Sequence, residues 1–569
     1  MDKTWKLKPC PVPAEQQLYK LLHNHVPLLL CRLLTQRGIS RYEEAQQFFF
    51  PSLEHLHDPW LMKDMDKAVN RIVDAISHGE KILVYGDYDV DGTTAVATVY
   101  SFLLEQYNKI DFYVPNRDKE GYGISMQGIE YAKNNDFDLV IALDCGIRAT
   151  NLISIAKEQG IEFIVCDHHL PGEELPPAVA ILNPKQEGCH YPYKDLSACG
   201  IGFKLVSALA LRRGTPAAEV LPYLTLVATS IAADIVPMNG ENRVMTHFGL
   251  KYINENPQPG IKALIELSQV KTSLTTSNLV FMIAPRVNAA GRMGDARKAV
   301  QLFLEKDAGK AKNLAQSLHE ENGDRKIVDL HITTEAINLI KDDEENGSKK
   351  ATVLYQPHWH KGVVGIVASR LIDKHYYKPT VILTQSNDVV AGSARSVIGF
   401  NVYDAIHQCR DLLENYGGHF YAAGMTMKVE NVEAFKSRFE EVVASTITEE
   451  MLTPQIIIDT EIQLQDITPH FYKKLKMFEP FGPENMRPLF VARNVKDAGY
   501  SKIVKDEHLK LTVKQDQGPI FGGIGFYMKD KFPLISGGKL FDIAFTIEEN
   551  DWNGNVSLQL KVVDIQAAQ

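Results

Sequence analysis

Four short apolar runs, separated by stretches of helical pattern, constrain the fold of this chain more than any other feature of its sequence. Each run is rich in β-branched and aromatic side chains, which is typical of the buried strands of a parallel sheet. The alternation of such strands with helices predicts an α/β fold with a doubly wound sheet. The runs are Ile82–Tyr85, Ile110–Val114, Leu139–Leu143 and Phe163–Cys166.

Acidic and imidazole side chains directly follow three of these runs. The carboxyl ends of parallel strands meet at one edge of a sheet, and open α/β proteins bind their ligands there. We therefore expect these side chains to share one site. They are Asp87, Asp89 and Asp91 after the first run, Asp144 after the third, and Asp167, His168 and His169 after the fourth.

Carboxylates on a rigid turn, together with imidazoles, are suitable ligands for Mn²⁺ or Mg²⁺. An aspartate-rich turn alone is equally well explained as a helix cap, and a single histidine is more often structural. Asp234 adds a carboxylate on the otherwise apolar segment 228–236, where an uncompensated charge is costly. These carboxylates and imidazoles are therefore the candidate metal ligands, and Asp167 is also a candidate for a group that orients an imidazole.

The chain has 569 residues, more than one hydrophobic core normally supports, so we expect several domains. It contains neither a long uninterrupted apolar stretch nor a secretory signal pattern, which predicts a cytoplasmic protein without a membrane span. The seven cysteines form no Cys-x-x-Cys, which argues against a disulfide framework or a thiolate zinc site. The net charge of −10 only mildly opposes nucleic-acid binding, because an acidic total is compatible with a local basic groove.

Changes of pattern along the chain predict five segments. A charged helical stretch from Lys306 to Asp343 indicates a helical connector. A second α/β pattern begins at Ala351, and short strands after Met451 with glycine-rich turns such as Asn553-Gly554 indicate a small β-barrel. The predicted division is an N-terminal segment (1–50), a catalytic α/β domain (51–250), the connector (251–350), the second α/β domain (351–450) and the barrel (451–569).

Four motifs occur in an order that resembles the DHH phosphoesterase superfamily. They are Tyr85-Gly-Asp-Tyr-Asp-Val-Asp-Gly-Thr-Thr, Leu143-Asp-Cys-Gly, Asp167-His-His and Ala232-Ala-Asp. Within that superfamily, further segments resemble the RecJ family of single-strand-specific 5′-to-3′ DNA exonucleases, with its DHH, DHHA1 and OB-fold domains. These segments are 116–123, 285–293, 358–370, 392–396 and 417–425.

The resemblance implies an exonuclease of DNA repair and recombination that releases 5′-mononucleotides by two-metal hydrolysis. It implies that Asp144 bridges two Mn²⁺ or Mg²⁺ ions, with Asp89 on one ion and Asp91, His168 and Asp234 on the other. His169 would face the substrate, so Asp144 and His169 are the expected catalytic residues. Many members of the superfamily have a histidine where this chain has Tyr85, so one ion is expected to have fewer protein ligands unless Asp87 compensates.

The resemblance also implies a site for the 5′-terminal phosphate, far along the chain from the metal motifs. Ser393, Arg395 and Arg117 match RecJ positions expected there, and Arg292 is expected on the same surface, because an arginine fork binds phosphate oxygens bidentately. Gly418 and His419 lie on a glycine turn that a phosphate could approach closely. A surface ion pair for each arginine and a plain turn for the glycines are the alternative explanations.

The expected partners are single-stranded DNA, a helicase and a single-strand-binding protein, with the enzyme itself a monomer. The C-terminal barrel would bind the strand through lysines and stacked aromatic side chains, although Phe478 and Phe481 are better explained as core residues. The main alternative is a DHH phosphodiesterase of short oligonucleotides or cyclic dinucleotides. A pyrophosphatase and a non-catalytic DNA-binding scaffold are less favoured, because the barrel, the connector and all the predicted metal ligands are present.

Overall fold

The structure is a computed structural model that describes residues 3–270, 272–343, 348–552 and 555–568, so the turn predicted at Asn553-Gly554 lies outside the described residues. The chain forms two compact units. Unit 1 contains Leu56–Val236 and Gly240–Pro454, and unit 2 contains Lys3–His55, Pro237–Asn239 and Gln455–Gln569.

The first sheet of unit 1 has five parallel strands in the order β3-β2-β4-β5-β6. The strand order reverses at β2, which lies between β3 and β4, so the carboxyl ends of β2 and β4 flank a topological switch point. This order confirms the predicted doubly wound sheet. The strands are β2 (Ile82–Gly86), β3 (Ile110–Tyr113), β4 (Leu139–Leu143), β5 (Glu162–Cys166) and β6 (Ala180–Leu182).

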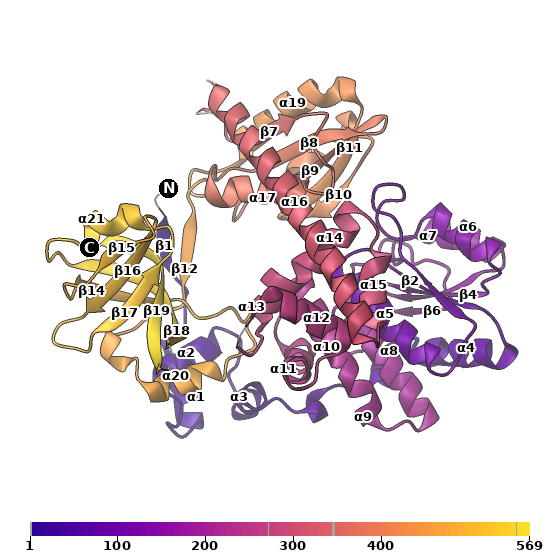
Figure 1. Ribbon diagram of the computed structural model, residues 1–569, viewed down its shortest axis with the longest axis horizontal. Helices are drawn as coiled ribbons and strands as arrows, with labels where there is room; N and C mark the ends of the chain where they lie inside the picture. Colours follow the sequence, from indigo (N-terminus) through magenta and orange to yellow (C-terminus); the bar gives the residue numbers. More distant parts are fainter. Residues whose placement is uncertain (1–2, 271, 344–347, 553–554, 569) are drawn as a thin grey trace. The chain divides into compact units, whose positions relative to one another are not determined.

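Helices cover both faces of this sheet (Figure 1). On one face α6 and α7 enclose a core that includes Leu83, Tyr85 and Val140, and on the other α5 and α8 pack against the strands. Helices α5 and α8 contain long runs of buried residues, which is why neither shows a clear amphipathic pattern. The helices are α4 (Met65–His78), α5 (Val90–Leu104), α6 (Met126–Asn134), α7 (Thr150–Glu158), α8 (Ala198–Arg213), α9 (Ala217–Val220), α10 (Leu224–Asp234) and α11 (Gly240–Glu255).

A helical connector links this sheet to the second one. Its longest member, α16, begins with a side-chain cap at Asp307, whose carboxylate accepts a hydrogen bond from the Lys310 amide at 2.8 Å. In Figure 1, α16 runs from the neighbourhood of α15 to that of β7. The connector helices are α12 (Pro259–Ser268), α13 (Thr276–Asn278), α14 (Ala284–Met293), α15 (Arg297–Leu304) and α16 (Ala308–Asp342).

The second sheet of unit 1 is mixed, in the order β10-β11-β9-β8-β7. Only the β7–β8 pair is parallel, and the strands of the other pairs are antiparallel. This sheet confirms a second α/β region. Its elements are β7 (Thr352–Tyr355), α17 (Val364–Lys374), β8 (Thr380–Ser386), β9 (Val389–Arg395), α18 (Val402–His407), β10 (Asn415–His419), β11 (Ala422–Met427) and α19 (Val432–Thr446).

Unit 2 contains a ring of five strands, because β14 pairs with both β18 and β16. N-terminal helices pack on this ring in one hydrophobic core, and β1 (Thr4–Leu7) pairs in parallel with β12 (Gln455–Ile458). Phe478 is fully buried in that core, in agreement with its interpretation as a core residue. The other elements are α1 (Val12–Leu21), α2 (Leu28–Thr35), α3 (Tyr42–Phe49), β13 (Thr460–Glu461), α20 (Pro469–Lys476), β14 (Phe490–Asp497), β15 (Lys502–Val504), β16 (His508–Lys514), β17 (Phe521–Gly525), α21 (Phe532–Ile535), β18 (Phe541–Trp552) and β19 (Asn555–Ala567).

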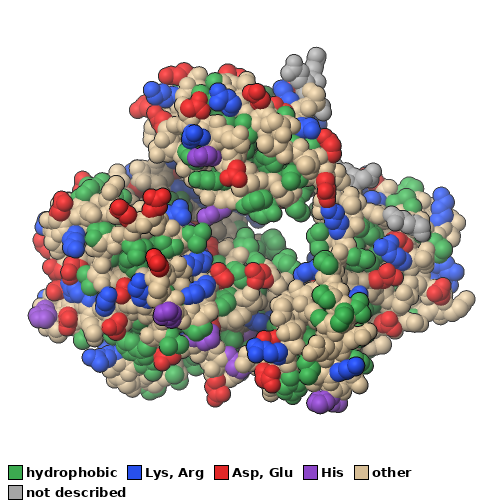
Figure 2. Space-filling view, turned by 180° about the vertical axis from the view of Figure 1, so that it is seen from behind, with side chains coloured by type: hydrophobic (Ala, Val, Ile, Leu, Met, Phe, Trp, Pro, Cys, Tyr) green, Lys and Arg blue, Asp and Glu red, His purple; other side chains and the backbone are tan. Residues whose placement is uncertain are grey.

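Charged side chains of both signs are interspersed on the surface that Figure 2 shows. The net charge of −10 therefore does not appear there as one continuous acidic surface. Within the described residues, no helix has the combination of length and apolar character that a membrane crossing requires.

Candidate active site

The turn between β2 and α5 holds its aspartates in a fixed geometry. Asp89 caps α5, and its Oδ1 accepts a hydrogen bond from the Gly92 amide at 3.0 Å. A Cβ at Gly92 would lie 2.4 Å from the backbone oxygen of Asp87, so only glycine allows the helix to begin this close to the strand end. The alternating aspartates are thus placed by backbone packing before any ligand binds.

Asp91 points into the interior and also stabilises a second helix. Its carboxylate accepts hydrogen bonds from the backbone amides of Ala198 and Cys199, each at 2.8 Å, and from Ser230 Oγ at 2.7 Å. The two amides belong to the first turn of α8, whose positive end favours a carboxylate. This side chain therefore has a structural role in addition to its place beside His168.

Asp144 lies at the end of β4 in the left-handed backbone region, with φ of 62°. It is buried, and its Oδ1 has no hydrogen-bond partner among the described residues. A buried carboxylate oxygen without a hydrogen bond is costly, because it has lost its hydration and has only the imidazole of His168 nearby, at 3.3 Å. Asp144 therefore provides the clearest indication that a cation belongs at this edge of the sheet.

His168 brings the carboxylates together around one imidazole nitrogen. Its Nε2 lies 3.3 Å from Asp144 Oδ1, 3.6 Å from Asp234 Oδ2 and 3.8 Å from Asp91 Oδ2. Asp234 is the last residue of α10, so an element well separated in sequence from the sheet supplies one of these oxygens. The structure thus brings together all five of the predicted ligands, with Asp89 grouped beside Asp144.

Asp87 belongs to the same cluster, whereas Tyr85 does not. One oxygen each from Asp87, Asp89 and Asp144 lies within 4.8 Å of the others. The Tyr85 ring is buried in the core beneath α6, and its hydroxyl donates to the backbone oxygen of Gly123 at 2.9 Å. Tyr85 therefore contributes to the packing of the core and not to the cluster.

The electrostatics of the cluster also favour the binding of a cation. Burial and then the repulsion of neighbouring carboxylates raise the pKa of Asp87, Asp144 and Asp234. Burial likewise lowers the pKa of His168, which favours the neutral imidazole that binds metals. A divalent cation would relieve the repulsion among the carboxylates and accept the imidazole lone pair.

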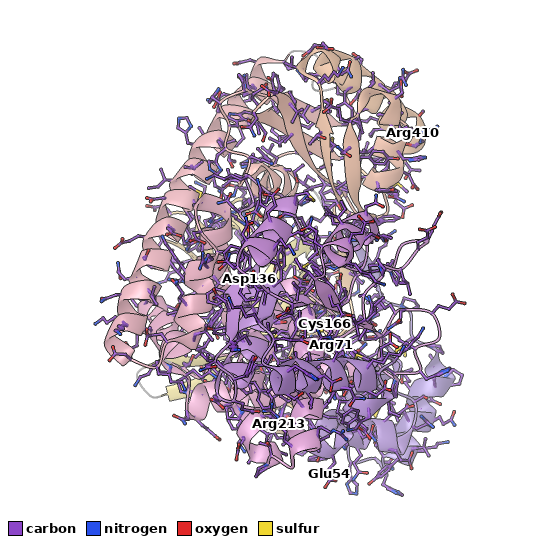
Figure 3. All side chains as sticks on the ribbon, turned by 90° about the vertical axis from the view of Figure 1, so that its right-hand side faces the viewer. Glu54, Arg71, Asp136, Cys166, Arg213 and Arg410 are labelled. Atoms are coloured by element: carbon purple, nitrogen blue, oxygen red, sulfur yellow. The ribbon has the colours of Figure 1, made fainter. Side chains whose placement is uncertain are left out.

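Asp167 and His169 form a separate pair beside the cluster, directly after Cys166, which Figure 3 labels at the end of β5. His169 Nδ1 lies 2.7 Å from Asp167 Oδ1, and Asp167 Oδ2 accepts from the Ile147 amide at 3.0 Å. Burial opposes the charged imidazole, but the contact with Asp167 is strong enough to raise the pKa of His169. This contact orients the ring.

Three predicted phosphate-binding arginines lie near one another. Burial and then the charges of Arg117, Arg325 and Arg395 lower the pKa of Arg292 to about 10. Arg395 Nη1 donates to Ser393 Oγ at 2.9 Å, and Arg117 lies over the ring of Tyr88 at 5.4 Å. No ion pair with a carboxylate is found for Arg117, Arg292 or Arg395 in the described part of the chain. Clustered guanidinium groups without anionic partners form a site for an anion.

Gly418 and His419 line a cavity with His169. The cavity has a volume of about 500 Å³, and its lining also includes Tyr122 and Arg148. A Cβ at Gly418 would lie 2.4 Å from the backbone oxygen of Ala422, so the hairpin requires glycine there. The prediction of a glycine turn was wrong, because Gly418 and His419 are the last two residues of β10 and pair with β11. They nevertheless face the same space as the second histidine of the Asp-His-His motif.

Several side chains that contact this site were not predicted. Ser230 binds Asp91, and the Tyr122 hydroxyl donates to the backbone oxygen of Asp144 at 2.7 Å and lies within 3.4 Å of both ring nitrogens of His169. Arg325, on α16, contributes to the positive field at Arg292. Tyr122 lies within the segment 116–123 that also contains Arg117, and this position was the one available signal.

Family models match three regions of the chain. The DHH family N-terminal domain matches residues 81–231, the DHHA1 domain matches 348–445, and the RecJ OB domain matches 458–564. These ranges cover the first sheet, the second sheet and the strand ring respectively.

Curated relatives match nearly the whole chain. The single-stranded-DNA-specific exonuclease RecJ of Bacillus subtilis (strain 168) is 36% identical over 549 residues, which cover 96% of this chain and 69% of that protein. The protein of the same name from Escherichia coli (strain K12) is 32% identical over 569 residues, covering 96% of each chain. A crystal structure of RecJ from Thermus thermophilus in complex with Mn²⁺ has a TM-score of 0.85 at 27% identity, covering 100% of this chain and 80% of that one.

Proposed function

The chain belongs to the RecJ family of single-stranded-DNA-specific exonucleases. We propose that it hydrolyses single-stranded DNA from the 5′ end. It releases 5′-mononucleotides and uses two divalent ions, Mn²⁺ or Mg²⁺. Its role is in DNA repair and recombination. The observation that carries the proposal is the cluster at the ends of β2, β4 and β5, whose Asp144 Oδ1 is buried without a partner among the described residues.

The residues present fit a pair of ions. Asp87, Asp89 and Asp144 would supply oxygens for one ion, and Asp91, His168 and Asp234 would supply the ligands of the other. Asp144 would be the shared ligand, because its Oδ1 also lies 3.3 Å from His168 Nε2. Asp87 acts as the ligand that the superfamily resemblance would assign to a histidine at the position of Tyr85. The Tyr85 side chain is therefore not needed as a ligand and packs in the core.

When bound, two such ions activate a water molecule and stabilise the entering and leaving oxygens of an in-line displacement at phosphorus. The side chains of the protein orient the groups that contact the scissile phosphate. Asp167 holds His169 through Nδ1, which leaves Nε2 to donate a hydrogen bond to an oxygen of the scissile phosphate. Tyr122, hydrogen bonded to the backbone of Asp144, fixes the wall of the cavity beside this histidine.

The arginine cluster recognises the 5′ terminus of the strand. Arg117, Arg292 and Arg395, with Ser393, bind the terminal phosphate, while Gly418 and His419 contact the strand beside His169. Support comes from the mutual repulsion of the guanidinium groups and the absence of carboxylate partners in the described residues. A terminal phosphate supplies the negative charge that this cluster lacks.

Unit 2 binds the single strand through the face of β15 and β16. Lys502 lies directly opposite Lys510, and Lys496 lies directly opposite Lys514. Like charges in these positions destabilise a sheet, so an anionic partner is needed to offset them. Tyr500, 74% exposed near the same strands, is available to stack on bases.

The enzyme acts as a monomer in the cytoplasm. Its partners are a helicase that unwinds its substrate and a single-strand-binding protein. The five-segment division at residues 50, 250, 350 and 450 is retained, with the N-terminal segment assigned a structural role beside the strand ring because it shares that core.

The proposal is tested by a time course with Mn²⁺ on three substrates: 5′-phosphorylated single-stranded DNA, duplex DNA and a cyclic dinucleotide. We expect 5′-mononucleotides from the single strand and little product from the others. Asp144→Asn should abolish the hydrolysis, whereas Asp66→Asn, at an exposed position of α4, should not.

Two results would refute the proposal in different ways. Undiminished hydrolysis by Asp144→Asn would remove Asp144 from the mechanism. A cyclic dinucleotide hydrolysed faster than the single strand would support the alternative phosphodiesterase function instead.

A further inference from the structure

Gly365 lies in the first turn of α17, where its backbone gives no reason for a glycine. The helix spans Val364–Lys374, and Gly365 does not have a positive φ. Alanine is favoured over glycine in a helix by up to about 1 kcal/mol. A conformational requirement therefore does not explain this residue, and a close contact has to be considered.

The contact is with two side chains that we assign to the terminal-phosphate site. A Cβ at Gly365 would lie 2.8 Å from Arg395 Nη2 and 2.8 Å from Ser393 Oγ. Both belong to β9, which packs against α17. The side chain that is absent at Gly365 thus leaves the space in which the guanidinium and the hydroxyl come together.

Three other helical glycines of unit 1, Gly249, Gly260 and Gly323, have different surroundings. A Cβ at Gly249 or Gly260 would meet a backbone oxygen at 2.2 Å, so these residues allow helices to pack closely. A Cβ at Gly323, in α16, would meet nothing within 4 Å. Gly365 differs from these three because the two atoms nearest to its Cβ position are the polar ends of side chains.

Because of this difference, a methyl group at position 365 should affect phosphate binding more than the stability of the fold. The ends of Ser393 and Arg395 can rotate away from a new methyl group at little cost to stability. That movement would break the 2.9 Å hydrogen bond from Arg395 Nη1 to Ser393 Oγ, and it would turn the guanidinium away from its present direction. The backbone of α17 would remain in place.

We propose that Gly365 is a specificity-determining residue: its missing side chain lets Ser393 and Arg395 adopt the geometry that recognises a 5′-terminal phosphate. The inference rests on the proposed function and adds a residue to it. It explains why a residue that weakens a helix lies in the first turn of α17. Gly365 acts by positioning the two side chains that contact the phosphate.

The test compares Gly365→Ala with Gly323→Ala, a matched control in an open helical position. For each variant, kcat/KM is measured on oligonucleotides that carry a 5′-phosphate or a 5′-hydroxyl. Hydrogen bonds to a charged group contribute enough that Gly365→Ala should reduce the ratio of the two values at least about 10-fold. The melting midpoint of Gly365→Ala should equal or exceed that of the wild type, and Gly323→Ala should leave the ratio unchanged.

A double variant shows whether Gly365 acts through Arg395. The ratio for Gly365→Ala with Arg395→Gln should fall no lower than that for Arg395→Gln alone, because the two changes remove one interaction. An unchanged ratio in Gly365→Ala, or additive losses in the double variant, would overturn the inference. Failure of the wild type to degrade single-stranded DNA would instead refute the proposed function.

Discussion

Replacing Asp144 with asparagine should stabilise the metal-free protein while weakening its response to metal. Asparagine has nearly the same shape and is among the residues that best tolerate the left-handed backbone found here, at φ of 62°. The change removes one negative charge from the centre of the carboxylate cluster. Alanine would be a poorer probe, because it would add backbone strain at the same position.

The size of the effect follows from the spacing of the carboxylates. Oxygens of Asp87, Asp89 and Asp144 lie within 4.8 Å of one another, so each charged pair repels by about 3.5 kcal/mol at an effective dielectric constant of about 20. Protons that bind to the cluster relieve part of this repulsion. We therefore expect a gain in the free energy of unfolding of about 1 to 3 kcal/mol, which raises the melting midpoint by roughly 1 to 5 °C.

The response to Mn²⁺ should change in the opposite direction. At a free concentration of about 100 Kd, metal binding stabilises the wild type by about 2.7 kcal/mol. If the loss of the shared ligand weakens binding about 100-fold, the same concentration stabilises Asp144→Asn by only about 0.4 kcal/mol. The variant should thus melt above the wild type in chelator, and Mn²⁺ should reduce its advantage by about 2.3 kcal/mol.

Calorimetric melting in EDTA and in Mn²⁺ measures both effects on the same samples. Asp66→Asn is the control, because it removes a carboxylate from an exposed helix position. It should change neither the melting point in EDTA nor the increase caused by Mn²⁺ appreciably. A variant that is less stable than the wild type without metal, or that keeps the full Mn²⁺ response, would refute the electrostatic account of this cluster.

Three further predictions concern residues with other roles. Asp91→Ala should lower the metal-free melting point, unlike Asp144→Asn, since it leaves the buried amides of Ala198 and Cys199 without an acceptor at about 1 to 3 kcal/mol each, while Ser230 keeps Ser197 as a partner; a higher melting point would contradict this. Glu241→Ala should lower the free energy of unfolding, measured by urea denaturation, by about 3 to 5 kcal/mol, because Lys204 Nζ lies 2.6 Å from the Glu241 carboxylate and would keep a buried charge without its partner. A loss below about 1 kcal/mol, as for a surface pair, would show that the charge is solvated. Gly418→Ala should speed hydrogen exchange in the β10–β11 hairpin, because its Cβ would lie 2.4 Å from the Ala422 oxygen; unaltered protection would exclude that clash.

The first sheet and the position of its polar residues were predictable from local sequence. Buried parallel strands are apolar along their whole length, and Asp87, Asp144 and Asp167 directly follow such strands. A doubly wound sheet then brings strand ends together, so contiguous patterns were sufficient to predict the edge at which these residues meet.

Contacts between distant segments could not be predicted in this way. Nothing in the residues around Tyr85 indicates that its ring packs beneath α6, because a tyrosine is compatible with either a core or a site. The approach of Arg292 to Arg395 joins α14 to the second sheet, and only tertiary packing reveals it. The same holds for Ser230, whose hydroxyl is an ordinary member of an apolar helix until Asp91 is placed beside it.

The parallel pairing of β1 with β12 has a consequence for how the chain is made. Lys3–His55 is synthesised before unit 1, yet the strands on which it packs are synthesised after unit 1. At about 5 to 20 residues per second, roughly 20 to 80 s separate the two on the ribosome. During that interval unit 1 can fold, while the early helices expose the apolar faces that later join the core of unit 2. This N-terminal segment is therefore where a nascent chain of this protein would most need the protection of a chaperone.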